Sequence, residues 1–76
     1  MNELSRWAER ARAYARSELK DADQAREQAR RDRTAGRLQR AVACEHEARI
    51  LEQAARTQLL IADEIQAPVP ERGGSQ

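Results

Sequence analysis

Small and aliphatic residues recur in this chain as two matched series, and a single point near Ala35 and Gly36 reflects one series onto the other. Residues within each series are spaced mostly by three, four or seven positions, so on a helix they line one face. The first series and its mirror-related counterparts are Ala8, Ala11, Ala15, Leu19, Ala22 and Ala29, and Ala62, Leu59, Ala55, Leu51, Ala48 and Ala41. Residues that face each other across an antiparallel helix pair lie equally far from the turn. We therefore predict an all-α fold, an antiparallel two-helix hairpin with an alanine-rich coiled-coil interface.

Helix formers and helix breakers set the expected bounds of the two helices. Ala, Arg, Glu, Gln and Leu dominate residues 2–33, where no Pro or Gly occurs, and Pro68 and Pro70 cannot continue a helix. The expected elements are a first helix at about 2–33, a turn at about 34–36 and a second helix at about 37–66. Together they give a hairpin domain over 1–67, followed by a disordered tail over 68–76.

The turn is the weakest local signal, because Gly36 is its only strong marker. Gly36 within one continuous helix would cost about 1 kcal/mol relative to alanine, and two such rods paired antiparallel would satisfy the same mirror relation. We favour the hairpin, because a glycine suits the left-handed residue that ends a helix and because the two halves have nearly equal lengths.

Several larger apolar residues fall off or beside the alanine-rich stripe and need another surface to cover them. Leaving them in water would forfeit several kcal/mol at roughly 25 cal/mol per Å². A chain of 76 residues gains little from one small core, so a second copy is the expected cover. We predict a homodimeric, two-fold symmetric four-helix bundle, with a different protein on the same face as the alternative. The expected face consists of Trp7, Tyr14, Val42, Ile50, Leu60 and Ile61.

Six arginines crowd the predicted hairpin tip, where Glu27 and Asp32 are the only acidic residues of the same sequence window. The six are Arg26, Arg30, Arg31, Arg33, Arg37 and Arg40. Guanidinium groups at helical spacing can bridge the phosphates of a nucleic acid or meet an acidic protein. The net charge of +1 and the pI of about 8.0 are low for a nucleic-acid-binding domain, so a solvated charged end is the simplest interpretation.

No residue pattern in the chain predicts catalysis, a metal, a cofactor or a small-molecule substrate. The only cysteine, Cys44, and the only histidine, His46, lie two positions apart, so on a helix they point in different directions. The acidic residues are explained instead by helix-stabilising pairs four positions apart. These expected pairs are Glu27 with Arg31, Glu45 with Arg49, and Glu52 with Arg56.

The chain carries no stretch typical of a signal peptide or a transmembrane helix, so we expect a cytoplasmic protein. Leu4, Trp7 and Tyr14, flanked by arginines, could anchor an amphipathic helix on an anionic membrane. The match of this stripe to the second helix favours a protein core instead. Membrane binding is therefore not expected.

The predicted architecture is similar to that of the small plasmid-encoded helical-hairpin dimers that bind RNA, and this likeness of fold implies nucleic-acid binding as one function. The residues themselves favour a different one. We expect a non-enzymatic helical interaction protein, an adaptor or inhibitor, that binds another macromolecule and self-associates through its apolar face. A nucleic-acid-binding hairpin that uses the arginine tip is the alternative.

Overall fold

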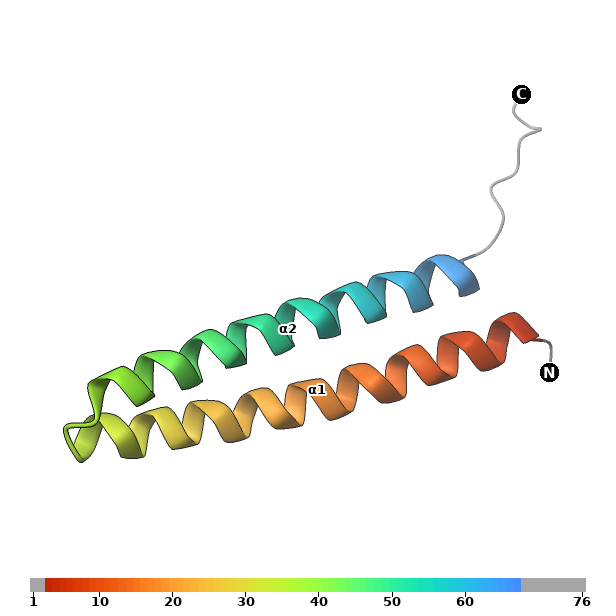
Figure 1. Ribbon diagram of the computed structural model, residues 1–76. Helices are drawn as coiled ribbons and strands as arrows, with labels where there is room; N and C mark the ends of the chain where they lie inside the picture. The colour runs from red at the N-terminus through yellow and green to blue at the C-terminus, as the bar shows by residue number, and fades with distance from the viewer. Residues whose placement is uncertain (1–2, 68–76) are drawn as a thin grey trace, which may run out of the picture.

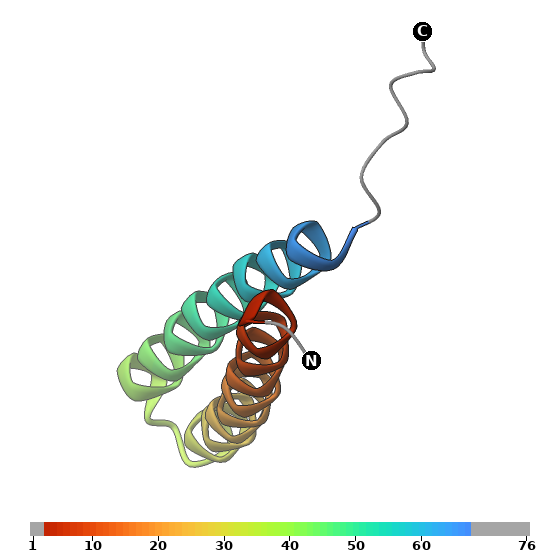
Figure 2. The same ribbon diagram turned by 90° about the vertical axis from the view of Figure 1, so that its right-hand side faces the viewer.

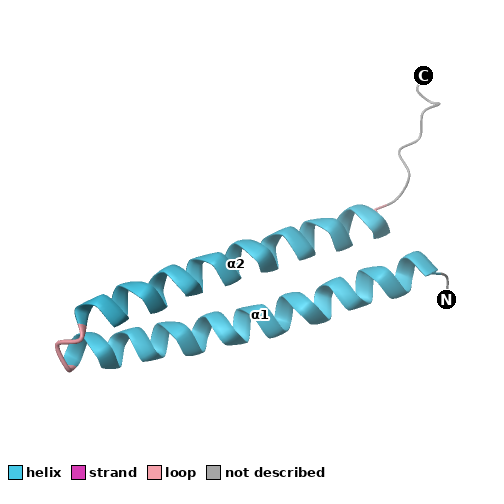
Figure 3. Cartoon of the chain, viewed as in Figure 1, coloured by secondary structure: helices cyan, strands magenta, loops and turns pink. Residues whose placement is uncertain are grey.

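The computed structural model describes residues 3–67, which form two helices joined by a tight turn. Helix α1 spans Glu3–Thr34 and helix α2 spans Leu38–Gln66. The two helices lie side by side and antiparallel, so the start of α1 is next to the end of α2 (Figures 1 and 2). The short turn is the only loop between them (Figure 3). The predicted two-helix hairpin is therefore confirmed, whereas the expected tail at 68–76 lies outside the described residues.

Gly36 ends α1 in the left-handed conformation, with a φ of +80°. The backbone N–H of Gly36 donates to the carbonyl of Arg33 at 3.1 Å, and that of Arg37 donates to the carbonyl of Asp32 at 2.7 Å. This pair of bonds is the Schellman motif, which satisfies carbonyls that the end of a helix would otherwise leave free. The motif turns the chain back at Gly36 and excludes a continuous helix.

Gly36→Ala is expected to destabilise the hairpin by about 1 kcal/mol, because an L-residue is strained in the left-handed region. A Cβ atom built at Gly36 would meet no atom within 4 Å, so backbone strain alone sets this cost. Chemical denaturation followed by circular dichroism measures the difference. Gly36→Asn serves as the matched control and should cost less, since asparagine tolerates this conformation. Equal stability of the alanine variant and the native chain would contradict the expectation.

Nine alanines form the interior of the hairpin, and none is more than 6% exposed. We call this set the alanine seam; it consists of Ala8, Ala11, Ala15, Ala22, Ala29, Ala41, Ala48, Ala55 and Ala62. Apart from Ala11, its members recur every seven residues on each helix, which is the period of a coiled coil. At the open end of the hairpin, Ala8, Ala11 and Ala62 cluster with the half-buried Ile65. The alanine positions of the predicted interface are thus confirmed.

The leucines of the predicted stripe do not belong to the interior. Leu19 and Leu59 are 40% and 37% exposed, and Leu51 is half-buried. Leu19 and Leu59 each lie four residues after a seam alanine, which places them on the side of the helix pair rather than between the helices. A seam of methyl groups brings two helices too close to admit a leucine side chain, so these residues occupy the flank.

Candidate interaction surfaces

Three ion pairs cross between the helices, all on one side of the alanine seam, and in each α1 supplies the arginine and α2 the carboxylate. The Nε and Nη2 atoms of Arg33 both donate to the Glu45 carboxylate at 2.8 Å. Arg26 likewise makes two hydrogen bonds to Glu52. Near the open end, Arg12 Nη2 lies 3.6 Å from an oxygen of Asp63. We call this side of the hairpin the braced face.

The partners of Glu45 and Glu52 differ from those predicted. We expected each glutamate to pair with the arginine four positions later in its own helix, but both pair with arginines of α1. Arg33 and Glu45 each lie four residues after a seam alanine, so the antiparallel packing sets them opposite each other. An arginine can donate two hydrogen bonds to one carboxylate, and this bidentate geometry favours the cross-helix pair. The predicted pair of Glu27 with Arg31 is present at 3.8 Å.

These ion pairs shift the pKa values of both partners in the direction that preserves their charges. The hydrogen bonds from Arg33 lower the pKa of Glu45, and those from Arg26 lower the pKa of Glu52, in each case against a smaller opposing effect of burial. The pKa values of Arg26 and Arg33 are raised by the same bonds. Both pairs therefore remain charged at neutral pH, although exposed pairs of this kind contribute modestly to stability.

Within residues 3–67, Asp32 is the one charged residue that is buried between the helices, with 1% of its surface exposed. Its Oδ1 atom accepts hydrogen bonds from Arg37 Nε at 3.0 Å and from Gln28 Nε2 at 3.2 Å, while Oδ2 has no partner. Burial raises the pKa of Asp32, but the bonds from Arg37 and Gln28 outweigh it, so the net shift is downward. Asp32 thus ties the last turn of α1 to the residue that precedes α2.

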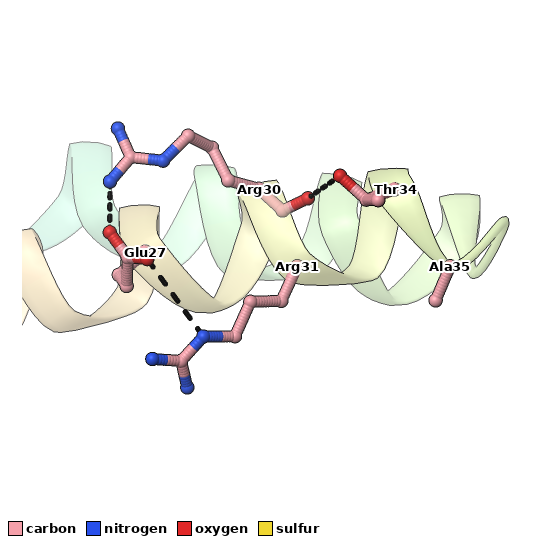
Figure 4. Close-up of a pocket in the computed structure, with 5 residues that line it drawn as sticks. All are labelled: Glu27, Arg30, Arg31, Thr34 and Ala35. Carbon is pink, nitrogen blue, oxygen red and sulfur yellow. Dashed lines mark hydrogen bonds and ion pairs between the residues drawn. The ribbon is translucent and has the colours of Figure 1, made fainter.

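The predicted arginine tip is largely neutralised by carboxylates. Arg30 and Arg31 share the carboxylate of Glu27 beside a shallow hollow, and Thr34 donates to the backbone carbonyl of Arg30 at 3.0 Å (Figure 4). Five of the six candidate arginines form ion pairs, and Arg40 is the exception within residues 3–67. Folding adds Glu45 and Glu52 to the two acidic residues counted in the sequence window, so the tip is less positive than the sequence indicated.

The side opposite the braced face carries no cross-helix ion pair within residues 3–67. Its residues lie one position before the alanines that recur every seven residues. Residues of both helices line one hollow on this side, so their positions share one face of the hairpin. They are Asp21, Ala25 and Gln28 of α1 and Cys44, Glu47 and Leu51 of α2. We call this side the open face; its two rows are Trp7, Tyr14, Asp21 and Gln28, and Arg40, Glu47, Ala54 and Ile61.

The six apolar candidates divide between the open face and other parts of the surface. Trp7, Tyr14 and Ile61 are 58%, 63% and 44% exposed and lie on the open face, with Ile50 at its edge. The guanidinium of Arg10 lies 5.6 Å from the centre of the Trp7 ring, close enough for a cation–π contact.

Two of the six candidates lie elsewhere. Val42 follows a seam alanine by one residue and so borders the braced face, and Leu60 points away from α1. The candidate face predicted from the sequence did not include Leu51, Cys44 and Ile65, which are half-buried along the open face. The seven-residue spacing of the alanines is the signal that locates them.

Comparison with protein-family models, curated proteins and solved structures returns no significant match. Among the described residues, no helix is long and apolar enough to cross a bilayer. Within the same part of the chain, no group of three or more His, Cys, Asp or Glu side chains is arranged to hold a metal ion.

Proposed function

We propose that this chain is a non-enzymatic interaction protein, an adaptor or inhibitor, that binds another macromolecule through exposed apolar side chains and dimerises into a four-helix bundle. One observation carries the proposal: the apolar interior consists of alanine alone. Every larger apolar residue within 3–67 remains at least partly exposed. The side chains able to supply the most free energy on burial are thus available for association.

The energetics of the hairpin support the same proposal. Alanine methyl groups remove little apolar area from water, whereas burial of one leucine, isoleucine or valine side chain contributes about 1.5–3 kcal/mol. Helical domains of this size rarely hold together on one small core. Association would therefore stabilise the fold and form the complex in one step.

Capture from the source cell tests the proposal. The tagged full chain, with a photo-crosslinker on the open face, is expected to retain a specific macromolecule that Ile61→Glu loses. The neighbouring Leu60→Glu is the matched control and should retain it, because Leu60 points away from that face. A chain that captures nothing, or loses its partner equally in both variants, contradicts binding through the open face.

Nucleic-acid binding through the arginine tip is the second candidate function. It is favoured by Arg40, which is exposed and has no ion pair within residues 3–67, beside Arg30 and Arg31, which share one carboxylate. Arg26, Arg33 and Arg37 are each engaged by a carboxylate of their own, so three arginines rather than six are offered to phosphates.

Salt dependence tests this second function. If the tip binds RNA or DNA, the logarithm of affinity should fall linearly with the logarithm of salt concentration, and Arg40→Gln should reduce the slope by about 1. Arg16→Gln, in the half of α1 that is farther from the tip, is the matched control and should leave the slope unchanged. Absent binding, or affinity that does not respond to salt, would remove this function.

A further inference from the structure

We propose that the open face is the surface on which two copies of this chain pack, with their tips at opposite ends of the bundle. This inference rests on the proposed function and assigns its dimerisation to the open face, which a second copy and another macromolecule would then occupy in turn. It is carried by the difference between the two long faces, by the area of the open face and by the placement of its charges.

The two faces differ in what already covers the seam. On the braced face, arginines of α1 reach over to carboxylates of α2 on both sides of the exposed Leu19 and Leu59, so a second helix layer there would have to displace charged groups to reach the leucines. On the open face, Trp7, Tyr14 and Ile61 border a flank that no ion pair closes within residues 3–67. The half-buried Leu51 and Ile65 lie behind them. Packing a second helix layer there covers apolar groups without breaking a cross-helix ion pair.

The open face is also large enough for a stable dimer. The 32 residues of α1 span about 48 Å at 1.5 Å per residue. Two packed helices present a face about 18–20 Å wide, since their axes lie about 8–10 Å apart and each helix is about 10 Å across. The resulting area of about 900 Å² slightly exceeds the roughly 800 Å² per partner of a standard stable interface.

The charges on the open face favour tips at opposite ends. Asp21 and Glu47 line the same hollow. Two copies stacked with their tips together would bring four such carboxylates, and both Arg40 side chains, to matching levels. The opposite arrangement separates the two Glu47 side chains along the bundle, whereas the two Asp21 side chains, near the middle of α1, stay within about two helical turns of each other in either arrangement. It also brings each Arg40, near the tip, within about one helical turn of Glu64 of the second copy. Both are exposed and neither forms an ion pair within residues 3–67.

Sedimentation equilibrium and native mass spectrometry of the purified full chain test which surface pairs. We expect the mass of two chains, and a dimer dissociation constant raised roughly 30-fold or more by Ile61→Glu, as for loss of an interface hot spot. Leu60→Glu, its neighbour on α2, should change the constant less than about threefold. On α1, Tyr14→Glu and its neighbour Ala13→Glu form a second matched pair with the same expected contrast.

Circular dichroism of each variant verifies that the hairpin is still folded, so a change in mass reports the interface. A native chain that stays monomeric, or equal losses within both matched pairs, overturns the inference. The two proposals fail separately. A native chain that stays monomeric but captures another macromolecule in the source cell overturns this inference alone, and one that dimerises but captures nothing overturns the binding of another macromolecule alone.

Spin labels at the tip test the orientation. Ala35 is exposed at the turn, so Ala35→Cys in a Cys44→Ser background places one label at each tip. Tips at opposite ends should give label distances of about 40 Å or more, because α2 alone is 29 residues long and rises about 1.5 Å per residue. A distance near two helix diameters, roughly 20 Å, would place the tips together and overturn the proposed arrangement.

Discussion

Ala15→Leu is expected to destabilise the hairpin by about 2 kcal/mol, because the larger side chain has no space in the alanine seam. Ala15 is fully buried between the helices, so a larger side chain at this position cannot extend into solvent. A leucine there must either separate the helices or adopt a strained rotamer. Thermal unfolding should record a Tm lower by roughly 8–16 °C for a domain of this size.

Ala13→Leu provides the matched control for this prediction. Ala13 is exposed two residues earlier in the same helix, and the two substitutions change helix propensity by the same small amount. The control is expected to alter stability by no more than about 0.5 kcal/mol. If the two variants unfold at the same temperature, or if Ala15→Leu is the more stable, then the seam tolerates leucine and does not set the spacing of the helices.

The sequence predicted the hairpin because small residues at mirror-related positions are a property of the whole chain, which one local misreading does not change. Its error over Leu19 and Leu59 has a specific cause. Residues spaced by three and four positions can lie either on the flank of the helix pair or between the helices, so this spacing alone does not distinguish the two locations. The strict seven-residue recurrence from Ala8 to Ala29, and from Ala41 to Ala62, separates the two positions, since each leucine stands four residues after a seam alanine.

The surfaces were harder to predict than the fold, because charged residues have acceptable partners both in their own helix and across the pair. Glu45 has Arg49 four residues later in α2 and Arg33 opposite in α1, and sequence spacing favoured the first. The choice depends on the rotation of each helix about its own axis, which the buried alanines set. The same rotation divides the apolar candidates, bringing Trp7 and Ile61 to one side and turning Leu60 away.

Acidification is expected to lower the Tm of the hairpin between pH 7 and pH 2.5, with most of the loss below about pH 4. Asp32, Glu45 and Glu52 all have pKa values below their ordinary values of 3.8 for aspartate and 4.5 for glutamate. A carboxylate with a lowered pKa in the folded state stabilises the fold above its ordinary pKa. It loses that contribution as the pH falls through its pKa in the folded state. Circular dichroism melts across this range measure the dependence.

The double variant Glu45→Gln and Glu52→Gln separates the cross-helix ion pairs from Asp32. At pH 7 it should unfold at a lower temperature than the native chain, because the carboxylates that bind Arg33 and Arg26 are gone. Its Tm should then fall less on acidification, so the two curves converge as the pH falls, and the remaining decline reports chiefly the loss of the Asp32 charge. Parallel curves would assign the acid sensitivity to other groups and leave the braced face without a measurable role in stability.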